Sequence, residues 1–151
     1  MIRRVVTSED LALVYKNFKT IAAEHPVRHY GLPYNPEILF QAWNNENLLI
    51  NSCVLVCNFT DEETIDALCW YVIGHDWRIH KDVASSYMWV STSGKSGLKV
   101  FKYALEVLRR KGIEIISTGF IVSKDSERIE KFLIKNGFKL ENKTYARITA
   151  Q

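Results

Sequence analysis

A run of small residues, Ser93-Gly94-Lys95-Ser96-Gly97, carries the clearest chemical signal in the chain. It follows the apolar run Met88-Trp89-Val90 and precedes a segment with helical periodicity, so we expect a loop that ends where a helix begins. Small side chains leave backbone N–H groups accessible there, and the positive end of the helix dipole attracts an anion. The pattern therefore predicts a site for a pyrophosphate group.

Two common phosphate-binding motifs do not explain this run. Gly94-Lys95-Ser96 resembles the end of a P-loop, but that motif needs a glycine five residues before its Gly-Lys pair, where this chain has Trp89. The chain also has no Gly-x-Gly-x-x-Gly run, so a Rossmann dinucleotide site has no support.

The segments around the loop predict the elements that position it. Apolar residues recur at helical spacing after Gly97, and Gly112 and Gly137 each precede an apolar residue, as at helix ends. The order of elements given below predicts an α/β (α+β) fold, in which a mixed sheet has helices on both faces. The elements expected in chain order are a strand 2–6, a helix from the Thr7-x-x-Asp10 capping box to before Pro26, a loop 27–34, a helix 35–44, strands 48–59 and 67–73, a polar loop 75–82, a strand 86–90, a helix 97–111, a strand 113–122, a helix 123–136, and a hairpin of 138–140 with 144–148.

The bulk composition describes one domain over residues 1–151. Hydrophobic residues make up 47% of the chain and charged residues 25%, which is typical of a globular protein. No run reaches the ~18 apolar residues of a membrane helix, and acidic residues come too early for a signal peptide, so we expect a cytoplasmic protein with no membrane partner. The formal charge of +3 suits an anionic cofactor but is too small to indicate nucleic acid.

Three cysteines, Cys53, Cys57 and Cys69, lie in apolar runs with strand character. Cys53 and Cys57 share a strand face but are too far apart for a disulfide within the strand. A zinc site needs clustered loop ligands and a closing pair, which this spacing does not offer. We therefore expect buried, reduced thiols and no metal.

The second half of the chain resembles the GCN5-related N-acetyltransferase (GNAT) superfamily over about residues 84–148. The run Ser126-x-x-Ile129-x-x-x-Leu133-x-Lys135-Asn136-Gly137-Phe138 is similar to that family's Asn-x-x-Ala-x-x-x-Tyr-x-Lys-x-Gly-Phe. The family's Arg/Gln-x-x-Gly-x-Gly/Ala loop matches here at Gly97, whereas Thr92 and Lys95 replace the first Arg/Gln and the first glycine.

This resemblance implies a mostly antiparallel central sheet and acetyl-CoA as co-substrate. The implied activity is transfer of an acyl group to a primary amine of a small molecule or a protein. Backbone groups of Met88, Trp89 and Val90 would face the pantetheine, and Ser126 would line the far side of the cofactor. Ser93, Gly94, Lys95, Ser96 and Gly97 would hold the pyrophosphate, so we expect Gly97→Asp to abolish CoA binding and to leave the fold intact.

The sequence singles out no catalytic residue. Leu133 stands where the family often has a tyrosine acid, which leaves Tyr87, Tyr145 or water to protonate the thiolate. His75, Asp76, His80 and Asp82 are candidate bases in the polar loop.

Two rival functions stay open at this point. One is a non-catalytic interaction protein with a degenerate cofactor site, and the other is a nucleic-acid-binding domain that rests only on the mild positive charge. The loop 29–34 lies where the resemblance implies the acceptor side, and aromatic residues on the first two helices would permit a homodimer.

Overall fold

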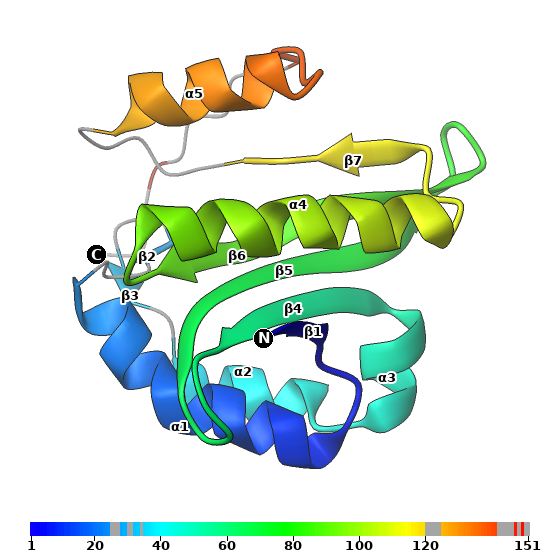
Figure 1. The fold of residues 1–151 in the computed structure, drawn as a ribbon. Coiled ribbons are helices and arrows are strands. Elements are labelled where there is room, and N and C mark those ends of the chain that lie inside the picture. The colour runs from blue at the N-terminus through cyan, green and yellow to red at the C-terminus, as the bar shows by residue number, and fades with distance from the viewer. Residues whose placement is uncertain are drawn as a thin grey trace.

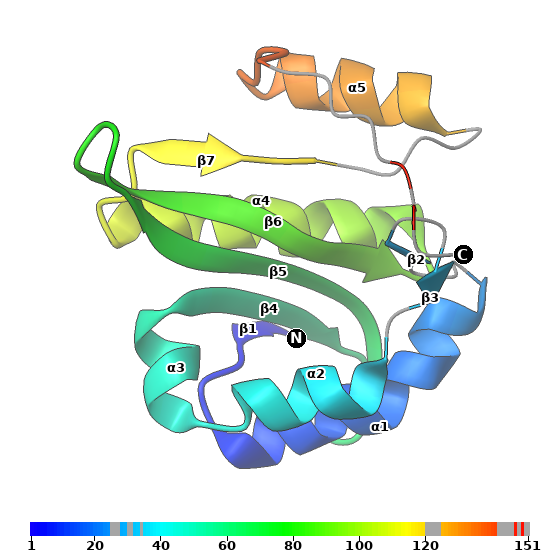
Figure 2. The same ribbon diagram turned by 180° about the vertical axis from the view of Figure 1, so that it is seen from behind.

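The computed structural model describes residues 1–24, 28–29, 32–33, 35–119, 125–141, 147 and 149. Its main sheet has five strands in the order β1-β4-β5-β6-β7 (Figures 1 and 2). Every neighbouring pair in it is antiparallel except β6 and β7, which run parallel. A separate small sheet pairs β2 with β3. The strands are β1 (Ile2–Arg4), β2 (Arg28–His29), β3 (Leu32–Pro33), β4 (Cys53–Phe59), β5 (Ile65–Asp76), β6 (Lys81–Ser91) and β7 (Ile115–Ser117).

Helices cover both faces of the main sheet, each with its own hydrophobic core (Figure 1). One core packs α1, α2 and α3 against the sheet, and the other packs α4 and α5 against the opposite face. This arrangement confirms the expected mixed, mostly antiparallel sheet. The helices are α1 (Ser8–Glu24), α2 (Pro36–Trp43), α3 (Glu46–Asn51), α4 (Gly94–Arg110) and α5 (Ser126–Lys135).

Strand β4 is buried on both of its faces, as its continuous apolar run predicts. Residues 53–57 have no exposed surface, because alternate side chains enter the two cores. All three cysteines are free and buried, which confirms the expected reduced thiols. Burial raises the pKa of the Cys53 thiol to about 11 and that of Cys57 well above its usual value.

The two helix starts that the sequence indicates most clearly form as expected. Thr7 Oγ1 accepts a hydrogen bond from the Asp10 N–H at 3.2 Å at the start of α1. Asn35 Oδ1 accepts one from the Ile38 N–H at 3.3 Å at the start of α2, with Pro36 in the first turn.

The prediction of a strand from Leu48 is wrong, because residues 46–51 form the helix α3 and β4 begins at Cys53. A short apolar run does not distinguish a buried strand from a buried helical turn. The helix begins because Asn45 Oδ1 accepts hydrogen bonds from the N–H groups of Asn47, at 2.9 Å, and Leu48, at 3.2 Å.

Two cations from distant parts of the chain stabilise the other end of α3. Arg4 Nη2 donates to the carbonyls of Leu49, Ile50 and Cys53 at 3.0, 2.6 and 2.8 Å. Lys111 Nζ adds a hydrogen bond to the Ile50 carbonyl at 3.2 Å. Positive side chains favour a helix C-terminus, where the last carbonyls have no partner within the helix.

Several other predicted boundaries are wrong. Strand β6 begins at Lys81, well before Ser86, because residues 81–85 pair with β5. Helix α4 begins at Gly94, which lies three residues before the expected start. Strand β7 covers only residues 115–117, and α5 begins at Ser126.

The closing hairpin is not observed in the described residues. Residues 138–140 form no strand, and their expected partner 144–148 lies outside the described part except for Arg147. Because a strand is assigned from its hydrogen bonds to a partner strand, and the expected partner is not described, the hairpin stays a prediction. In the part of the chain that the structure describes, no helix is long and apolar enough to cross a membrane.

We expect Arg4→Ala to lower the free energy of unfolding by about 2 kcal/mol, because it removes charged hydrogen bonds from three carbonyls at once. Lys111→Ala is the matched control, since it removes one exposed hydrogen bond and should cost less than about 1 kcal/mol. Urea unfolding of both variants measures the difference. Equal losses would contradict the role of Arg4 as the main cap of α3.

Candidate functional site

A β-bulge at Tyr87 divides strand β6 into two parts. Trp70 of β5 pairs with Met88 and Tyr71 pairs with Ser86, so Tyr87 is the additional residue between these pairs. As a result, Tyr87 and Met88 both pack in the core of α1 and α2, whereas Trp89 packs in the core of α4. A bulge of this kind re-aims the side chains and bends the strand.

The pairing of β6 with β7 ends just before this bulge. The last parallel pair is Ser85 with Ser117, although β6 continues to Ser91. Beyond that pair, Ser86 Oγ accepts a hydrogen bond from the Gly119 N–H at 2.9 Å, and the hydroxyls of Tyr71 and Thr118 are 2.6 Å apart. On the β7 side, the end of β6 therefore has no strand partner among the described residues.

Helix α4 begins directly beyond the free end of β6. Ser93 is its N-cap, and its hydroxyl oxygen accepts a hydrogen bond from the Ser96 N–H at 3.2 Å. Within the described residues, the N–H groups of Gly94 and Lys95 have no hydrogen-bond partner. The run of small residues lies at a helix start as expected, but Lys95, Ser96 and Gly97 belong to the first helical turn, not to a loop. Its role as an anion site stays a prediction.

Gly97 allows α4 to approach the end of β6 closely. A Cβ atom on Gly97 would lie 2.5 Å from Ser91 Oγ and 3.2 Å from Ser91 Cβ. The Trp89 indole N–H donates to the Gly97 carbonyl at 2.9 Å. Because this glycine faces the strand, a side chain at position 97 would crowd Ser91, so we expect Gly97→Asp to destabilise the fold as well as to disturb the predicted anion site.

The side chains of Met88, Trp89 and Val90 are committed to packing. Met88 is 5% exposed, and Val90 packs against the same core. Trp89 stacks on Phe101 of α4, with the ring centroids 4.5 Å apart and the planes at 27°. These three residues can therefore contact a ligand mainly through their backbone.

Arg128 is a candidate ligand residue that the sequence analysis missed. Its Nη2 atom lies 3.6 Å from the place that a Cβ on Gly94 would occupy, so the start of α5 brings a cation to the start of α4. Both helices begin on the same side of the molecule, at the left in Figure 1. Ser126, half-buried in the first turn of α5, shares this region. The sequence did not indicate Arg128, because this residue is distant from the loop along the chain and occupies no position of a phosphate-binding motif.

The candidate bases lie at the wrong end of the sheet. His75 and Asp82, whose side chains are 2.9 Å apart, form the tip of the β5–β6 hairpin together with Asp76 and His80. This tip is opposite to the start of α4 (Figure 1), and Asp82 is six positions before Met88 along the strand, about 20 Å away. The sequence did not indicate this distance, because residues 75–82 were expected to form a polar loop that could reach the acceptor amine.

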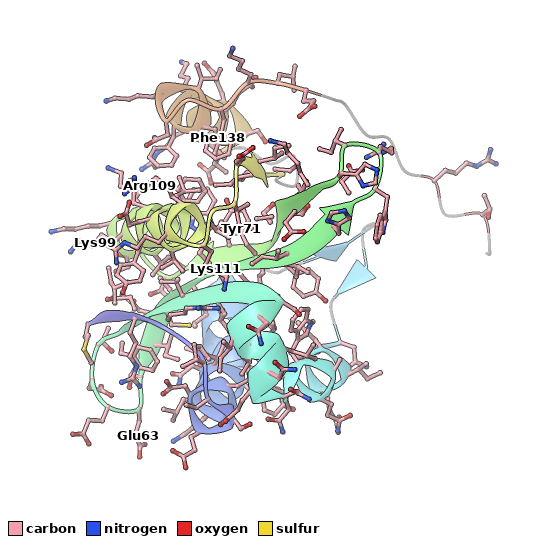
Figure 3. All side chains as sticks on the ribbon, turned by 90° about the vertical axis from the view of Figure 1, so that its right-hand side faces the viewer. Glu63, Tyr71, Lys99, Arg109, Lys111 and Phe138 are labelled. Atoms are coloured by element: carbon pink, nitrogen blue, oxygen red, sulfur yellow. The ribbon has the colours of Figure 1, made fainter. Side chains whose placement is uncertain are left out.

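The outer face of α4 is basic. Lys95, Lys99 and Lys102 are exposed, and Lys99 points away from the sheet in Figure 3, whereas Tyr71 lies inside. A lysine in the first turn is unfavourable for the helix itself, because the N-terminal dipole is positive. Lysines at this end of α4 therefore destabilise the isolated helix slightly, but they would attract a bound anion.

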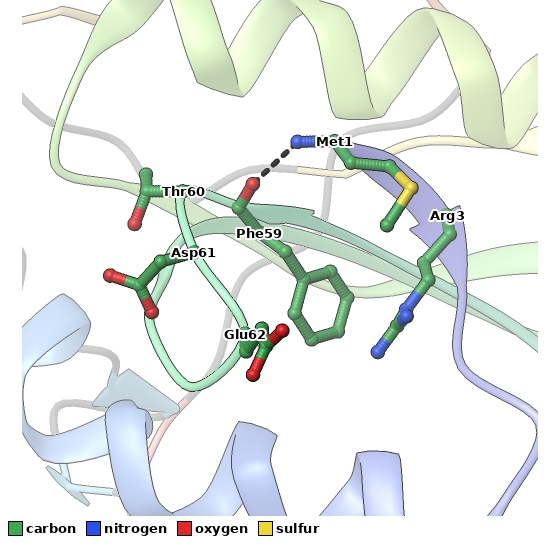
Figure 4. Close-up of a pocket in the computed structure, with 6 residues that line it drawn as sticks. All are labelled: Met1, Arg3, Phe59, Thr60, Asp61 and Glu62. Atoms are coloured by element: carbon green, nitrogen blue, oxygen red, sulfur yellow. Dashed lines mark hydrogen bonds between the residues drawn. The ribbon is translucent and has the colours of Figure 1, made fainter.

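A hollow of about 430 Å³ lies at the other edge of the sheet (Figure 4). It is lined by Met1, Arg3, Phe59 and residues 60–62. Arg3 is already engaged there, with an ion pair to Asp10 at 2.6 Å and its guanidinium 4.0 Å from the Phe59 ring centre. This hollow has no link to the free end of β6, and we do not assign the function to it.

No protein-family model matches the sequence, and no curated protein matches it. Solved structures do match over the whole chain. A protein described as a probable acetyltransferase is 17% identical, with a TM-score of 0.70 over 100% of this chain and 99% of its own. An aminoglycoside acetyltransferase from an uncultured soil metagenomic sample, solved with trehalose, is 16% identical, with a TM-score of 0.69 over 100% of this chain and 95% of its own.

A GNAT family acetyltransferase from Staphylococcus aureus is 12% identical, with a TM-score of 0.63 over 99% of this chain and 98% of its own. The chain has the GNAT acetyltransferase fold. Within this GNAT fold, Met88–Val90 lead directly into Ser93–Gly97, and Arg128 reaches Gly94 from the start of α5, where Ser126 lies. Their role as ligands of a cofactor stays a prediction.

We expect Gly97→Ala to lower the free energy of unfolding by about 1–3 kcal/mol, because its methyl group would overlap Ser91. Gly94→Ala is the matched control, since its methyl group meets only Arg128 Nη2 at 3.6 Å. Alanine favours a helix over glycine, so this variant should be neutral or slightly stabilised. Thermal and urea unfolding compare the two.

The double variant Ser91→Gly with Gly97→Ala tests the proposed contact directly. Removing the Ser91 side chain removes the overlap, so stability should partly return. If Gly97→Ala and Gly94→Ala unfold alike, close approach is not the reason for glycine at position 97.

Proposed function

We propose that the chain is an acetyl-CoA-dependent N-acetyltransferase that acts on a primary amine. The observation that carries the proposal is the continuous path from the end of β6 to the start of α4. Among the described residues, the end of β6 has no strand partner on its β7 side, and the first N–H groups of α4 have no hydrogen-bond partner. Strand-like backbone followed by a helix N-terminus suits a chain of amides that ends in a pyrophosphate. The GNAT fold of the chain supports the same function.

The residues divide into three contacts with the co-substrate. Backbone groups of Met88–Val90 would bind the pantetheine, and Ser93–Gly97 would bind the pyrophosphate through N–H groups. Ser126 would line the far side, and Arg128 would add the positive charge that Thr92 does not supply. Acetyl-CoA brings a reactive thioester, and the chain's own contribution is to orient it and to exclude water from it.

In the proposed reaction, the amine nitrogen forms a bond to the thioester carbon, the carbon–sulfur bond breaks, and the amine loses a proton to solvent. Leu133 cannot protonate the departing sulfur, and it is 6% exposed in the core beside α4. CoA can leave as a thiolate at modest cost, because a thiol pKa is about 8.5. Tyr87, at the bulge, remains a candidate acid.

The acceptor side would be the face of the bulge that Tyr87 and Met88 share with α2. The half-buried rings of Tyr87 and Trp43 have their centroids 6.3 Å apart there, and the fully buried Trp70 packs behind Tyr87 at 5.3 Å. Aromatic faces bind an apolar body or a single ammonium group better than they bind a polycationic sugar. We therefore favour an amine on an apolar body over an aminoglycoside, which the matched soil protein is named for.

A second candidate is a non-catalytic binding protein with the same fold. The specific observation in its favour is that two positions of the family motifs have side chains that cannot perform the usual role, as a proton donor at one and as a long polar side chain at the other. Leu133 lies in the core, and the Thr92 hydroxyl donates to the Asp66 carbonyl at 3.3 Å. A homodimer and a cytoplasmic location stay predictions, and the acceptor amine is not identified.

We expect acetyl-CoA at millimolar concentration to raise the melting temperature. A ligand at about 100 times its Kd stabilises the native state by about 2.7 kcal/mol, which corresponds to several degrees for a chain of this size. Thermal shift and calorimetry with acetyl-CoA measure this. Adenosine monophosphate, which lacks the pyrophosphate and the pantetheine, is the control ligand and should shift the melting temperature far less.

Turnover is then measured by the release of free CoA thiol from acetyl-CoA with a panel of amines. The three protein thiols are at most 1% exposed, so a thiol reagent should report CoA with little background. A thermal shift without turnover on any amine supports the non-catalytic candidate. The absence of both a thermal shift and binding heat with acetyl-CoA would contradict the acyltransferase proposal itself.

A further inference from the structure

One carboxylate, that of Asp66, lies against the first turn of α4. Asp66 is the second residue of β5, and its Oδ2 atom accepts a hydrogen bond from Ser96 Oγ at 2.8 Å. Its Oδ1 atom accepts a second hydrogen bond from Asn58 Nδ2 at 2.7 Å. The carboxylate is therefore fixed on the sheet side of the turn that offers its free N–H groups to an anion.

The backbone of Asp66 also holds the connection between β6 and α4. Its carbonyl accepts hydrogen bonds from the Thr92 N–H at 2.9 Å and from the Thr92 hydroxyl at 3.3 Å. Asp66 thus contacts both ends of the segment 92–96. Its position relative to the helix start is set by four hydrogen bonds, and the carboxylate cannot turn away without breaking two of them.

The charge of Asp66 is not offset by an ion pair. Both donors to the carboxylate, the Asn58 amide and the Ser96 hydroxyl, are neutral. Among the described residues, no lysine or arginine forms an ion pair with Asp66, and Arg128 approaches Gly94 instead. The negative charge is instead balanced by the positive end of the α4 dipole, which a bound anion would also use.

We propose that Asp66 is an affinity-determining residue, a built-in carboxylate that weakens the binding of the CoA pyrophosphate at the start of α4. The proposal rests on the acyl-CoA site proposed above. The fixed carboxylate repels the pyrophosphate and uses part of the same dipole, whereas Arg128 attracts it from the other side. The balance between these two side chains sets how tightly the co-substrate binds and how readily free CoA leaves.

The test compares CoA binding by Asp66→Asn with binding by the parent protein, using calorimetry with free CoA. Asparagine keeps the size of the side chain and can accept from Asn58 and donate to Ser96 Oγ. At about 0.02 M salt we expect the Kd of Asp66→Asn to fall by roughly three- to tenfold, because one repulsive charge near a dianion is removed. At about 0.3 M salt the difference should shrink to less than about twofold.

Two further variants separate the charge of Asp66 from other effects. Glu114→Gln removes one negative charge at the far end of the sheet, where Glu114 pairs with Lys81, and its Kd should stay within about twofold of the parent. Arg128→Gln should weaken binding by a similar factor to the gain in Asp66→Asn, and with the same salt dependence. Asp66→Ser serves as a second neutral variant if Asp66→Asn is unfolded by circular dichroism.

The outcomes separate this inference from the proposed function. If the parent binds CoA and both neutral variants bind equally or more weakly, Asp66 does not oppose the anion and the inference is overturned. A gain in Glu114→Gln equal to that in Asp66→Asn would also overturn it, because net charge alone would explain the effect. If neither the parent nor any variant binds CoA, the proposed function fails and this inference fails with it.

Discussion

The close contact between the start of α4 and the end of β6 is the constraint on which the rest of the site depends. Gly97 has no side chain, so the helix backbone lies directly against Ser91, and Trp89 donates to the Gly97 carbonyl. Trp89 also stacks on Phe101, one turn further along α4. Strand and helix are therefore joined, so the first N–H groups of α4 have a fixed direction relative to the edge of β6 that has no β7 partner among the described residues.

The bulge at Tyr87 adds the second half of this geometry. Without it, the alternation of β6 would place Met88 in the core of α4 and Trp89 in the core of α1. The additional residue reverses this order, and only then can Trp89 reach Gly97. The same bulge lies beyond the last pair with β7, so the strand is bent where its backbone becomes free. One inserted residue thus explains the contact of Trp89 with Gly97, and it lies where β6 has no further partner on its β7 side among the described residues.

The sequence predicts the elements better than it predicts their ends or their contacts. Capping side chains such as Asn35 act within four residues, so local pattern is enough to find them. Helix α3 was missed because its C-terminus depends on Arg4 and Lys111, which are distant along the chain. For the same reason Asp66 and Arg128 were missed, since each reaches the start of α4 from a different element. The helix start near these residues was found, to within three residues, because glycine and serine at a helix start have a local physical meaning.

The position of the charges would allow the proposed phosphate site to bind an anion although its sequence differs from the family motif. An arginine at position 92 would have to share the space in which Thr92 now hydrogen-bonds to β5. Because the cation is Arg128 of α5, Thr92 and Ser96 can both hydrogen-bond to Asp66. The position of this cation, and with it the proposed anion site, therefore depends on how α5 packs. That packing rests on Phe132 and Leu133, which contact the same core as Phe101 and Trp89. The leucine at position 133 is therefore better understood as part of the support for Arg128 than as a lost proton donor.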